Sequence, residues 1–136
     1  MKQYTRMTGS NLLDTNIVIE LFKGNPTITS FLETLKEEIN IPFAVLGELY
    51  LGAYRSTNPK KHIKQINSFL ERCNVLNADN ETANHYALIK TALLQKGKPI
   101  PENDMWIAAI SKQFDLNLHT KDKHFKEIYD LNLQSW

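Results

Sequence analysis

Asn11-Leu12-Leu13-Asp14-Thr15-Asn16, continued by Ile17-Val18-Ile19-Glu20-Leu21-Phe22, is the stretch that shows how the fold begins. Apolar residues lead directly up to Asp14, which is typical of a short buried strand. After Asp14 the apolar residues return at helical spacing until Gly24 ends the segment. The stretch therefore predicts a strand that passes into a helix at a polar residue.

The same alternation of short strands and helices continues along the chain. Further strands are predicted over residues 39–41, 75–76, 116–119 and 131–133. Further helices are predicted over residues 26–35, 44–54, 59–70, 80–96, 102–114 and 123–129. Short strands that alternate with helices or helix pairs call for an α/β fold, in which helices cover both faces of a mainly parallel sheet.

Length and composition fit one ordinary domain. The chain has 136 residues, of which 42% are hydrophobic and 23% charged. We expect residues 1–10 to form a flexible lead and residues 11–136 a single domain. The lone Cys73 excludes an internal disulfide framework and a cysteine-rich zinc site, and it suits a buried structural thiol. With no secretory signal and no apolar run near the roughly 20 residues of a membrane helix, we expect a cytoplasmic protein without a membrane partner.

The balance of charge is nearly neutral, but it is uneven along the chain. The formal net charge is +1, with −2 over residues 1–50 and +3 over residues 51–136. Lysines gather at Lys60, Lys61 and Lys64, at Lys96 and Lys98, and at Lys121, Lys123 and Lys126. Each group alone suits a solvated surface, whereas together they are candidates for a phosphate track.

Four acidic residues from distant segments are expected at one edge of the sheet. Asp14 ends the first strand, and Asp122 follows the strand at 116–119. Glu48 lies one turn into the helix after the second strand, and Asp104 lies in the first turn of the helix at 102–114. Since the sites of open parallel sheets lie at the carboxyl ends of the strands, these acids are the candidate site.

Each acid also has an ordinary structural interpretation. Asp14 suits a helix cap, Asp104 a first-turn acid that complements the helix dipole, and Asp122 an exposed loop charge. Glu48 is harder to explain, because its helix is otherwise almost wholly apolar. Two carboxylates about 4 Å apart repel by about 4 kcal/mol at an effective dielectric constant near 20, so a cluster of four requires a cation. Oxygen ligands of this kind suit Mg²⁺ or Mn²⁺, and such sites serve phosphoryl chemistry.

Four ordered segments of the chain resemble the motifs of PIN-domain nucleases. The segments are Leu12-Leu13-Asp14-Thr15-Asn16, Gly47-Glu48-Leu49, Asn103-Asp104-Met105-Trp106-Ile107-Ala108-Ala109 and Thr120-Lys121-Asp122-Lys123-His124-Phe125. The acids are 34, 56 and 18 residues apart, which is similar to the compact bacterial members. The resemblance extends from Asn11 to the end of the chain and is nearest to VapC-type toxins of type II toxin–antitoxin systems.

This resemblance implies a three-layer α/β/α sandwich and a metal-dependent endoribonuclease. It implies that Asp14, Glu48, Asp104 and Asp122 are the catalytic, metal-binding acids, with Mg²⁺ or Mn²⁺ as cofactor. Many relatives have Asn at the position of Asp122, so this residue binds the metal either directly or through water. Asn16 and Thr120 stand where the family has supporting residues.

The resemblance also implies partners. They are an RNA substrate and a cognate antitoxin, which we expect to insert a basic side chain near Asp14 and Asp104. In relatives, helices near residues 49–54 contribute to a homodimer and to an antitoxin groove, and a homodimer is expected here as well. Core packing is the alternative for these apolar and aromatic residues.

The histidines have mostly structural interpretations. His62 and His85 stand at polar positions of predicted helices, which suits the surface. His119 and His124 flank the segment Thr120-Lys121-Asp122, so either is a candidate for substrate contact.

Other functions remain open at this stage. One is a Mg²⁺-dependent phosphohydrolase with an aspartyl phosphate, but that class usually has an acid two residues after the strand Asp, where this chain has Asn16. A receiver-type signalling domain would need an acidic pair before its phosphorylated Asp, and this chain shows none. A non-catalytic PIN module that binds RNA or protein, or a housekeeping PIN nuclease, would share the same sequence features.

Overall fold

The computed structural model describes residues 10–35 and 39–136. The predicted flexible lead lies outside these residues except for Ser10. The elements, in chain order, are β1 (Asn11–Leu13), α1 (Thr15–Phe22), α2 (Pro26–Thr34), β2 (Ile39–Pro42), α3 (Phe43–Tyr54), α4 (Pro59–Leu70), β3 (Cys73–Leu76), α5 (Asn80–Gln95), α6 (Glu102–Gln113), β4 (Asn117–Thr120), the 3₁₀ helix η2 (Lys123–Glu127) and β5 (Leu133–Ser135).

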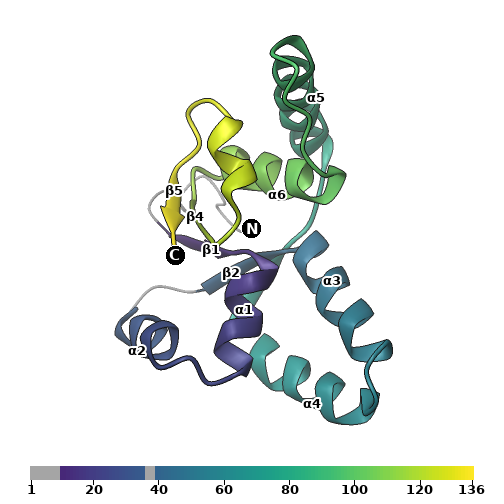
Figure 1. Cartoon of the computed structure of the whole chain (residues 1–136), viewed down its shortest axis with the longest axis vertical. Coiled ribbons are helices and arrows are strands. Elements are labelled where there is room, and N and C mark those ends of the chain that lie inside the picture. The colour runs from purple at the N-terminus through teal and green to yellow at the C-terminus, as the bar shows by residue number, and fades with distance from the viewer. Residues whose placement is uncertain (1–9, 36–38) are drawn as a thin grey trace.

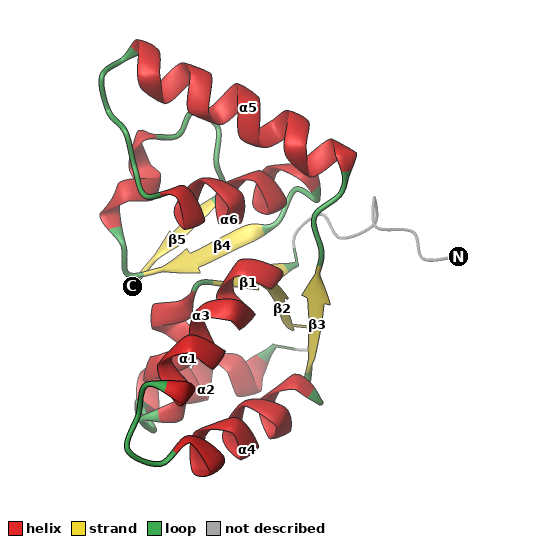
Figure 2. Ribbon diagram, turned by 90° about the vertical axis from the view of Figure 1, so that its right-hand side faces the viewer, coloured by secondary structure: helices red, strands yellow, loops and turns green. Residues whose placement is uncertain are grey.

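The five strands form one parallel sheet in the order β3-β2-β1-β4-β5. Helices α1 to α4 lie on one side of this sheet, and α5 and α6 lie on the other (Figures 1 and 2). The predicted α/β sandwich with a parallel sheet is therefore confirmed. Among the described residues, no helix is long and apolar enough to span a membrane.

The direction in which strands are added reverses beside β1. The chain proceeds from β1 outward to β2 and β3, and then returns across the sheet to place β4 on the other side of β1. At such a reversal the connections at the carboxyl ends of two adjacent strands diverge to opposite faces, which leaves a crevice where ligands bind. The residues that follow β1 and β4 therefore face this crevice.

The core fills the space between the sheet and its helices. Its completely buried side chains include Leu12 and Leu13 from β1, Ile107 and Ile110 from α6, and Phe125 from η2. At about 25 cal/mol for each Å² of apolar surface, burial of one such side chain contributes about 1.5–3 kcal/mol. These residues anchor α6, which carries Asp104, and the elements β1 and η2, which adjoin Asp14 and Asp122.

A series of polar side chains links the strands across the sheet. Asn74 donates to Asn40 Oδ1 over 3.3 Å, and Asn40 Nδ2 donates to the carbonyl of Asn11 over 3.2 Å. On the other side of β1, the 2.6 Å contact of His119 Nε2 with Asn11 Oδ1 and the 3.0 Å bond from Trp136 Nε1 to His119 Nδ1 continue the series. These bonds tie the C-terminal residue to β4 and β1.

The structure differs from the prediction in two places near the end of the chain and in one place in its middle. The last strand begins at Leu133 instead of residue 131, because the chain turns at Asp130 with a φ of 57° and first pairs with β4 at Leu133. The helix expected over 123–129 is the shorter 3₁₀ helix η2. Cys73 is the first residue of β3 instead of preceding it, and burial raises the pKa of its thiol to about 12.

Candidate functional site

Asp14 lies at the point where β1 passes into α1, and its side chain is almost completely buried. Its Oδ1 accepts a hydrogen bond from the backbone N–H of Thr15 over 2.7 Å, so Asp14 caps α1 as well as facing the crevice. Its Oδ2 accepts a 2.7 Å bond from the hydroxyl of Thr120 at the end of β4. The carboxylate is thus held between the two strands at which the sheet order reverses.

Asn16 and Thr120 hold the segments around Asp14 together. The amide nitrogen of Asn16 lies 3.3 Å from Asp14 Oδ2, and its carbonyl oxygen accepts from the backbone N–H of Lys121 over 3.0 Å. Thr120 Oγ1 accepts from the backbone N–H of Asp122 over 2.9 Å. The two predicted supporting residues therefore connect Asp14 to the loop that carries Asp122.

Asp104 and Asp122 both contact the same ring nitrogen of one histidine. Asp122 is half-buried and caps η2, with its Oδ1 accepting from the backbone N–H of His124 over 2.9 Å. The ring Nδ1 of His124 is 3.0 Å from Asp122 Oδ1 and 3.3 Å from Asp104 Oδ2. One ligand atom from each of these three side chains falls within 4.8 Å of the other two, a spacing that a single metal ion spans.

Glu48 lies beside this group and is held by two other polar side chains. Its Oε2 accepts from the hydroxyl of Thr15 over 3.0 Å, and its Oε1 accepts from the amide of Asn103 over 3.1 Å. Among the described residues, the group within ligand distance contains neither Glu48 nor Asp14. The structure thus brings all four acids to one crevice, with Asp104 and Asp122 close together and Glu48 at the side.

Burial and like charges make Asp14 and Asp104 harder to ionise. Burial raises the pKa of Asp14, the Thr120 and Thr15 hydrogen bonds lower it in part, and the charges of Glu48 and Asp122 raise it further. Burial also raises the pKa of Asp104 to about 6, and the negative charges of Asp14 and Asp122 add to this effect. Negative charge is therefore crowded in the crevice, which favours a bound cation.

Sequence reasoning missed two residues of the site and left a third undecided. Thr15 and Asn103 position Glu48, although neither was selected for that role. His124, one of two histidine candidates, reaches the acids. His119 does not, because its ring is buried between Asn11 and Trp136 and burial lowers its pKa to about 4.

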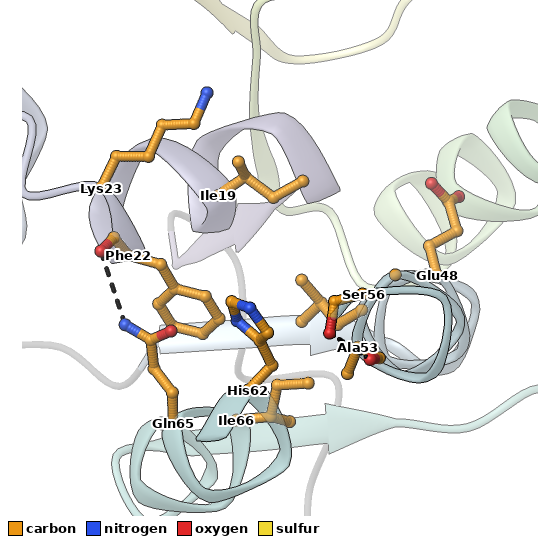
Figure 3. Close-up of a pocket in the computed structure, with 11 residues that line it drawn as sticks. Ile19, Phe22, Lys23, Glu48, Ala53, Ser56, His62, Gln65 and Ile66 are labelled. Carbon is orange, nitrogen blue, oxygen red and sulfur yellow. Dashed lines mark hydrogen bonds between the residues drawn. The ribbon is translucent and has the colours of Figure 1, made fainter. Parts of the chain in front are cut away.

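An apolar groove of about 350 Å³ opens beside Glu48, between α1, α3 and α4. Figure 3 shows Phe22, Ile66 and Ala53 along its walls, with Glu48 at its edge and pointing away from them. The residues that line it are Ile19, Phe22, Lys23, Glu48, Leu49, Gly52, Ala53, Ser56, His62, Gln65 and Ile66. His62, expected at the surface, is half-buried in this groove.

Comparison with known proteins identifies the family. The family model of the PIN domain matches residues 12–131 of the chain. The chain belongs to the PIN-domain family. This PIN domain is 34% identical over 129 residues to Ribonuclease VapC1 of Haemophilus influenzae (strain R2866), a match that covers 92% of this chain and 96% of that protein.

Solved structures of related proteins share the fold of this PIN domain. VapBC2 from Rickettsia felis, bound to a DNA fragment from its promoter, gives a TM-score of 0.88 at 30% identity, covering 93% of this chain and 98% of that one. VapBC-1 from nontypeable Haemophilus influenzae gives 0.84 at 35% identity, covering 93% and 97%. The predicted resemblance to the VapC group of PIN domains is thus confirmed.

Proposed function

We propose that this PIN domain is a metal-dependent endoribonuclease, acting in the cytoplasm as the toxin of a toxin–antitoxin pair. One observation carries the proposal, namely that Asp14, Glu48, Asp104 and Asp122 meet in the crevice at the sheet reversal. The ribonuclease name of a relative 34% identical to this chain supports the reaction class.

The donor set fits a hard divalent cation such as Mg²⁺ or Mn²⁺. Asp104 and Asp122 present carboxylate oxygens within ligand distance of each other, and Asp14 lies close enough for its charge to raise the pKa of Asp104. When bound, the cation supplies an activated water and neutralises charge on the phosphate. Asp104 and Asp122 would hold it, with Asp14 as the third acid.

The protein's own residues orient the acids of the site and offset part of the effect of burial on Asp14. Thr120 and Thr15 each donate to one oxygen of Asp14, which favours its ionised form and fixes the plane of the carboxylate. Asn103 fixes Glu48 in the same way from α6. The substrate's phosphodiester then meets a carboxylate arrangement that needs little reorganisation.

Basic residues beside the crevice suit a polyanionic substrate. Lys121 and Lys123 flank Asp122 in the chain, and both are exposed. Lys60, Lys61 and Lys64 belong instead to α4, which lies on the opposite side of the sheet from α5 and α6 (Figure 2). Lys121 and Lys123 are therefore the better candidates for contacts with RNA phosphates.

The apolar groove is the proposed docking site of the antitoxin. Its apolar walls suit an amphipathic segment of the antitoxin. Glu48 lies where the groove adjoins the acidic crevice, so a basic side chain of the same segment would pair with the carboxylates. The solved VapBC structures support such a partner. A homodimer through α3 is also proposed, because Leu51 and Tyr54 are exposed on that helix.

Brief induction of the chain in bacteria tests the cellular function. New 5′ ends at a restricted set of RNA sites are expected after induction, and none with the Asp14→Asn variant at the same protein level. An RNA population unchanged by induction of folded protein would contradict the toxin function. Unimpaired growth together with limited cleavage would indicate a housekeeping PIN nuclease, and no cleavage at all a non-catalytic module.

A further inference from the structure

His124 is a nitrogen donor placed among oxygen donors. Its Nδ1 is 3.0 Å from Asp122 Oδ1 and 3.3 Å from Asp104 Oδ2, and its side chain is 52% exposed. The side chain of Asp104 is only 13% exposed, so the ring lies at the mouth of the crevice with Nδ1 toward the acids.

The local chain geometry fixes this orientation. Asp122 accepts the backbone N–H of His124, which starts η2 directly after the acid. The next residue, Phe125, is completely buried in the core. With Phe125 anchored inward, the imidazole of His124 remains above the carboxylates instead of turning into the core.

We propose that His124 supplies a nitrogen ligand to the cation bound by Asp104 and Asp122, so that the site prefers Mn²⁺ and later first-row metals over Mg²⁺. This inference rests on the proposed metal-dependent function. Imidazole nitrogen suits transition metals, whereas Mg²⁺ takes oxygen ligands almost exclusively.

The distances agree with this role. In an octahedral site with ligands about 2.1 Å from the ion, neighbouring ligand atoms lie about 3.0 Å apart. The separations of Nδ1 from the two carboxylate oxygens, 3.0 and 3.3 Å, are close to this value. Nδ1 therefore has the spacing of a neighbouring ligand from each of the two carboxylate oxygens, and all three atoms lie within 4.8 Å of one another.

A protonated His124 that only screens the two carboxylates is the competing explanation. Such an imidazolium would be displaced or repelled by a cation, so it would leave no bond between nitrogen and metal. Its removal would leave the Mn²⁺ affinity unchanged or increase it.

Pulsed electron paramagnetic resonance of Mn²⁺ bound to the full chain distinguishes a ligating His124 from one that only screens the carboxylates. The nitrogen of a ligating imidazole gives a ¹⁴N coupling, which we expect in the wild type and in the control variant His85→Asn, and not in His124→Asn. His85 lies on α5, away from the crevice, and is half-buried. It is therefore a control in which the same substitution is made outside the site.

Equilibrium titration provides the second readout. His124→Asn should lower the Mn²⁺ affinity by about tenfold or more, since even loss of a residue that only supports a ligand costs 10–100-fold. The Mg²⁺ affinity should change by less than about twofold. Circular dichroism checks that the variant is folded, and His124→Gln repeats the test with a second side chain.

The outcomes distinguish this inference from the function on which it rests. Mn²⁺ bound without ¹⁴N coupling, and released in Asp104→Asn, would overturn the role of His124 and leave the metal site intact. Absence of site-specific Mn²⁺ binding in the wild type would overturn both.

Discussion

Asp104 is a site residue whose charge destabilises the metal-free protein at neutral pH. Its pKa is raised to about 6 from an ordinary 3.8, first by burial and then by neighbouring acids. The folded protein therefore binds a proton more tightly than the unfolded chain. Without a cation, the ionised Asp104 lowers the free energy of unfolding at neutral pH. The free energy of unfolding rises again as the pH falls from 6 toward 3.8, because the folded protein takes up the proton first.

Asp104→Asn should therefore stabilise the metal-free protein. In EDTA at pH 7 we expect the free energy of unfolding to rise by about 2 kcal/mol, and by less than about 1 kcal/mol at pH 4, where the wild-type carboxyl is already neutral. Urea denaturation at the two pH values measures both gains. A variant less stable than the wild type at pH 7 would show that the charge of Asp104 is satisfied without a cation.

Thr120 tests whether positioning of Asp14 matters for the reaction. Its hydroxyl donates to Asp14 and accepts from the backbone of Asp122, and it is almost completely buried. Thr120→Val should lower kcat by about 10- to 100-fold and the free energy of unfolding by about 1–3 kcal/mol, because the buried carboxylate of Asp14 and the partly buried N–H of Asp122 lose their partner. Thr120→Ser keeps the oxygen and should recover most of both losses. Wild-type kcat in a folded Thr120→Val would contradict this role.

The acids of the site were predictable from the sequence, whereas their supports were not. Asp14 and Asp122 follow buried strands, so topology alone brings them to one edge. The hydrogen bonds from Thr15 and Asn103 to Glu48 span 33 and 55 residues, and they leave no local pattern. The side on which His124 lies depends on η2, whose 3₁₀ geometry the helical spacing did not predict.

At the scale of elements, β4 carries both a site residue and a buried histidine. Thr120 faces Asp14, while His119 accepts from Trp136 and contacts Asn11 Oδ1 through its other nitrogen. A neutral ring with its proton on Nε2 satisfies both bonds, and protonation of Nδ1 would break the bond from Trp136. Protonation of His119 would therefore remove the side-chain bond of Trp136, whose backbone N–H would still donate to the carbonyl of Thr120 over 3.0 Å.

His119 should make the stability of the fold fall in acid. Burial lowers its pKa to about 4 from 6.5, so the unfolded chain binds a proton that the folded protein does not. The free energy of unfolding should drop by up to about 3 kcal/mol as the pH falls from 6.5 toward 4. His119→Gln removes this term, so the difference in stability between the wild type and the variant should narrow over that range. Asp104 titrates in both proteins, so its opposite contribution cancels when the two free energies of unfolding are subtracted. A difference that stays constant between pH 6.5 and pH 4 would contradict the prediction.

The order of elements was predicted correctly because most strands and helices have a clear local signal, although the signal for the strand at 75–76 is weak. The five strands and the helix pairs follow from apolar periodicity, and Pro26 and Pro59 stand at the starts of the helices they were expected to open. The boundaries near the C-terminus were less predictable. The turn at Asp130 has a positive φ of 57°, a conformation that the sequence usually signals with a glycine, and no glycine stands there.

At the scale of the whole molecule, the reversal of strand order explains why the site and the groove are neighbours. The acids occupy the crevice between β1 and β4, and the groove is formed by helices on one face beside it. The parallel sheet was predictable from the alternation of strands and helices, whereas its strand order was not predicted. The groove follows from no such pattern, since it is built from side chains on three helices.

Ile19 tests the proposed antitoxin groove. It lines the groove and is 40% exposed, so Ile19→Arg should fold while blocking an apolar segment. We expect loss of antitoxin binding by at least tenfold, with RNA cleavage retained. Leu94→Arg is the control, because Leu94 is 61% exposed on α5, which packs on the opposite side of the sheet. Equal binding by both variants would place the antitoxin elsewhere.

The metal dependence of RNA cleavage by the purified chain tests the central claim most directly. We predict cleavage with Mg²⁺ or Mn²⁺, complete loss in excess EDTA, recovery when the metal is restored, and no cleavage by a folded Asp14→Asn variant. Cleavage that continues undiminished in excess EDTA, or in Asp14→Asn, would contradict the assignment of the acidic crevice as a metal-dependent nuclease site.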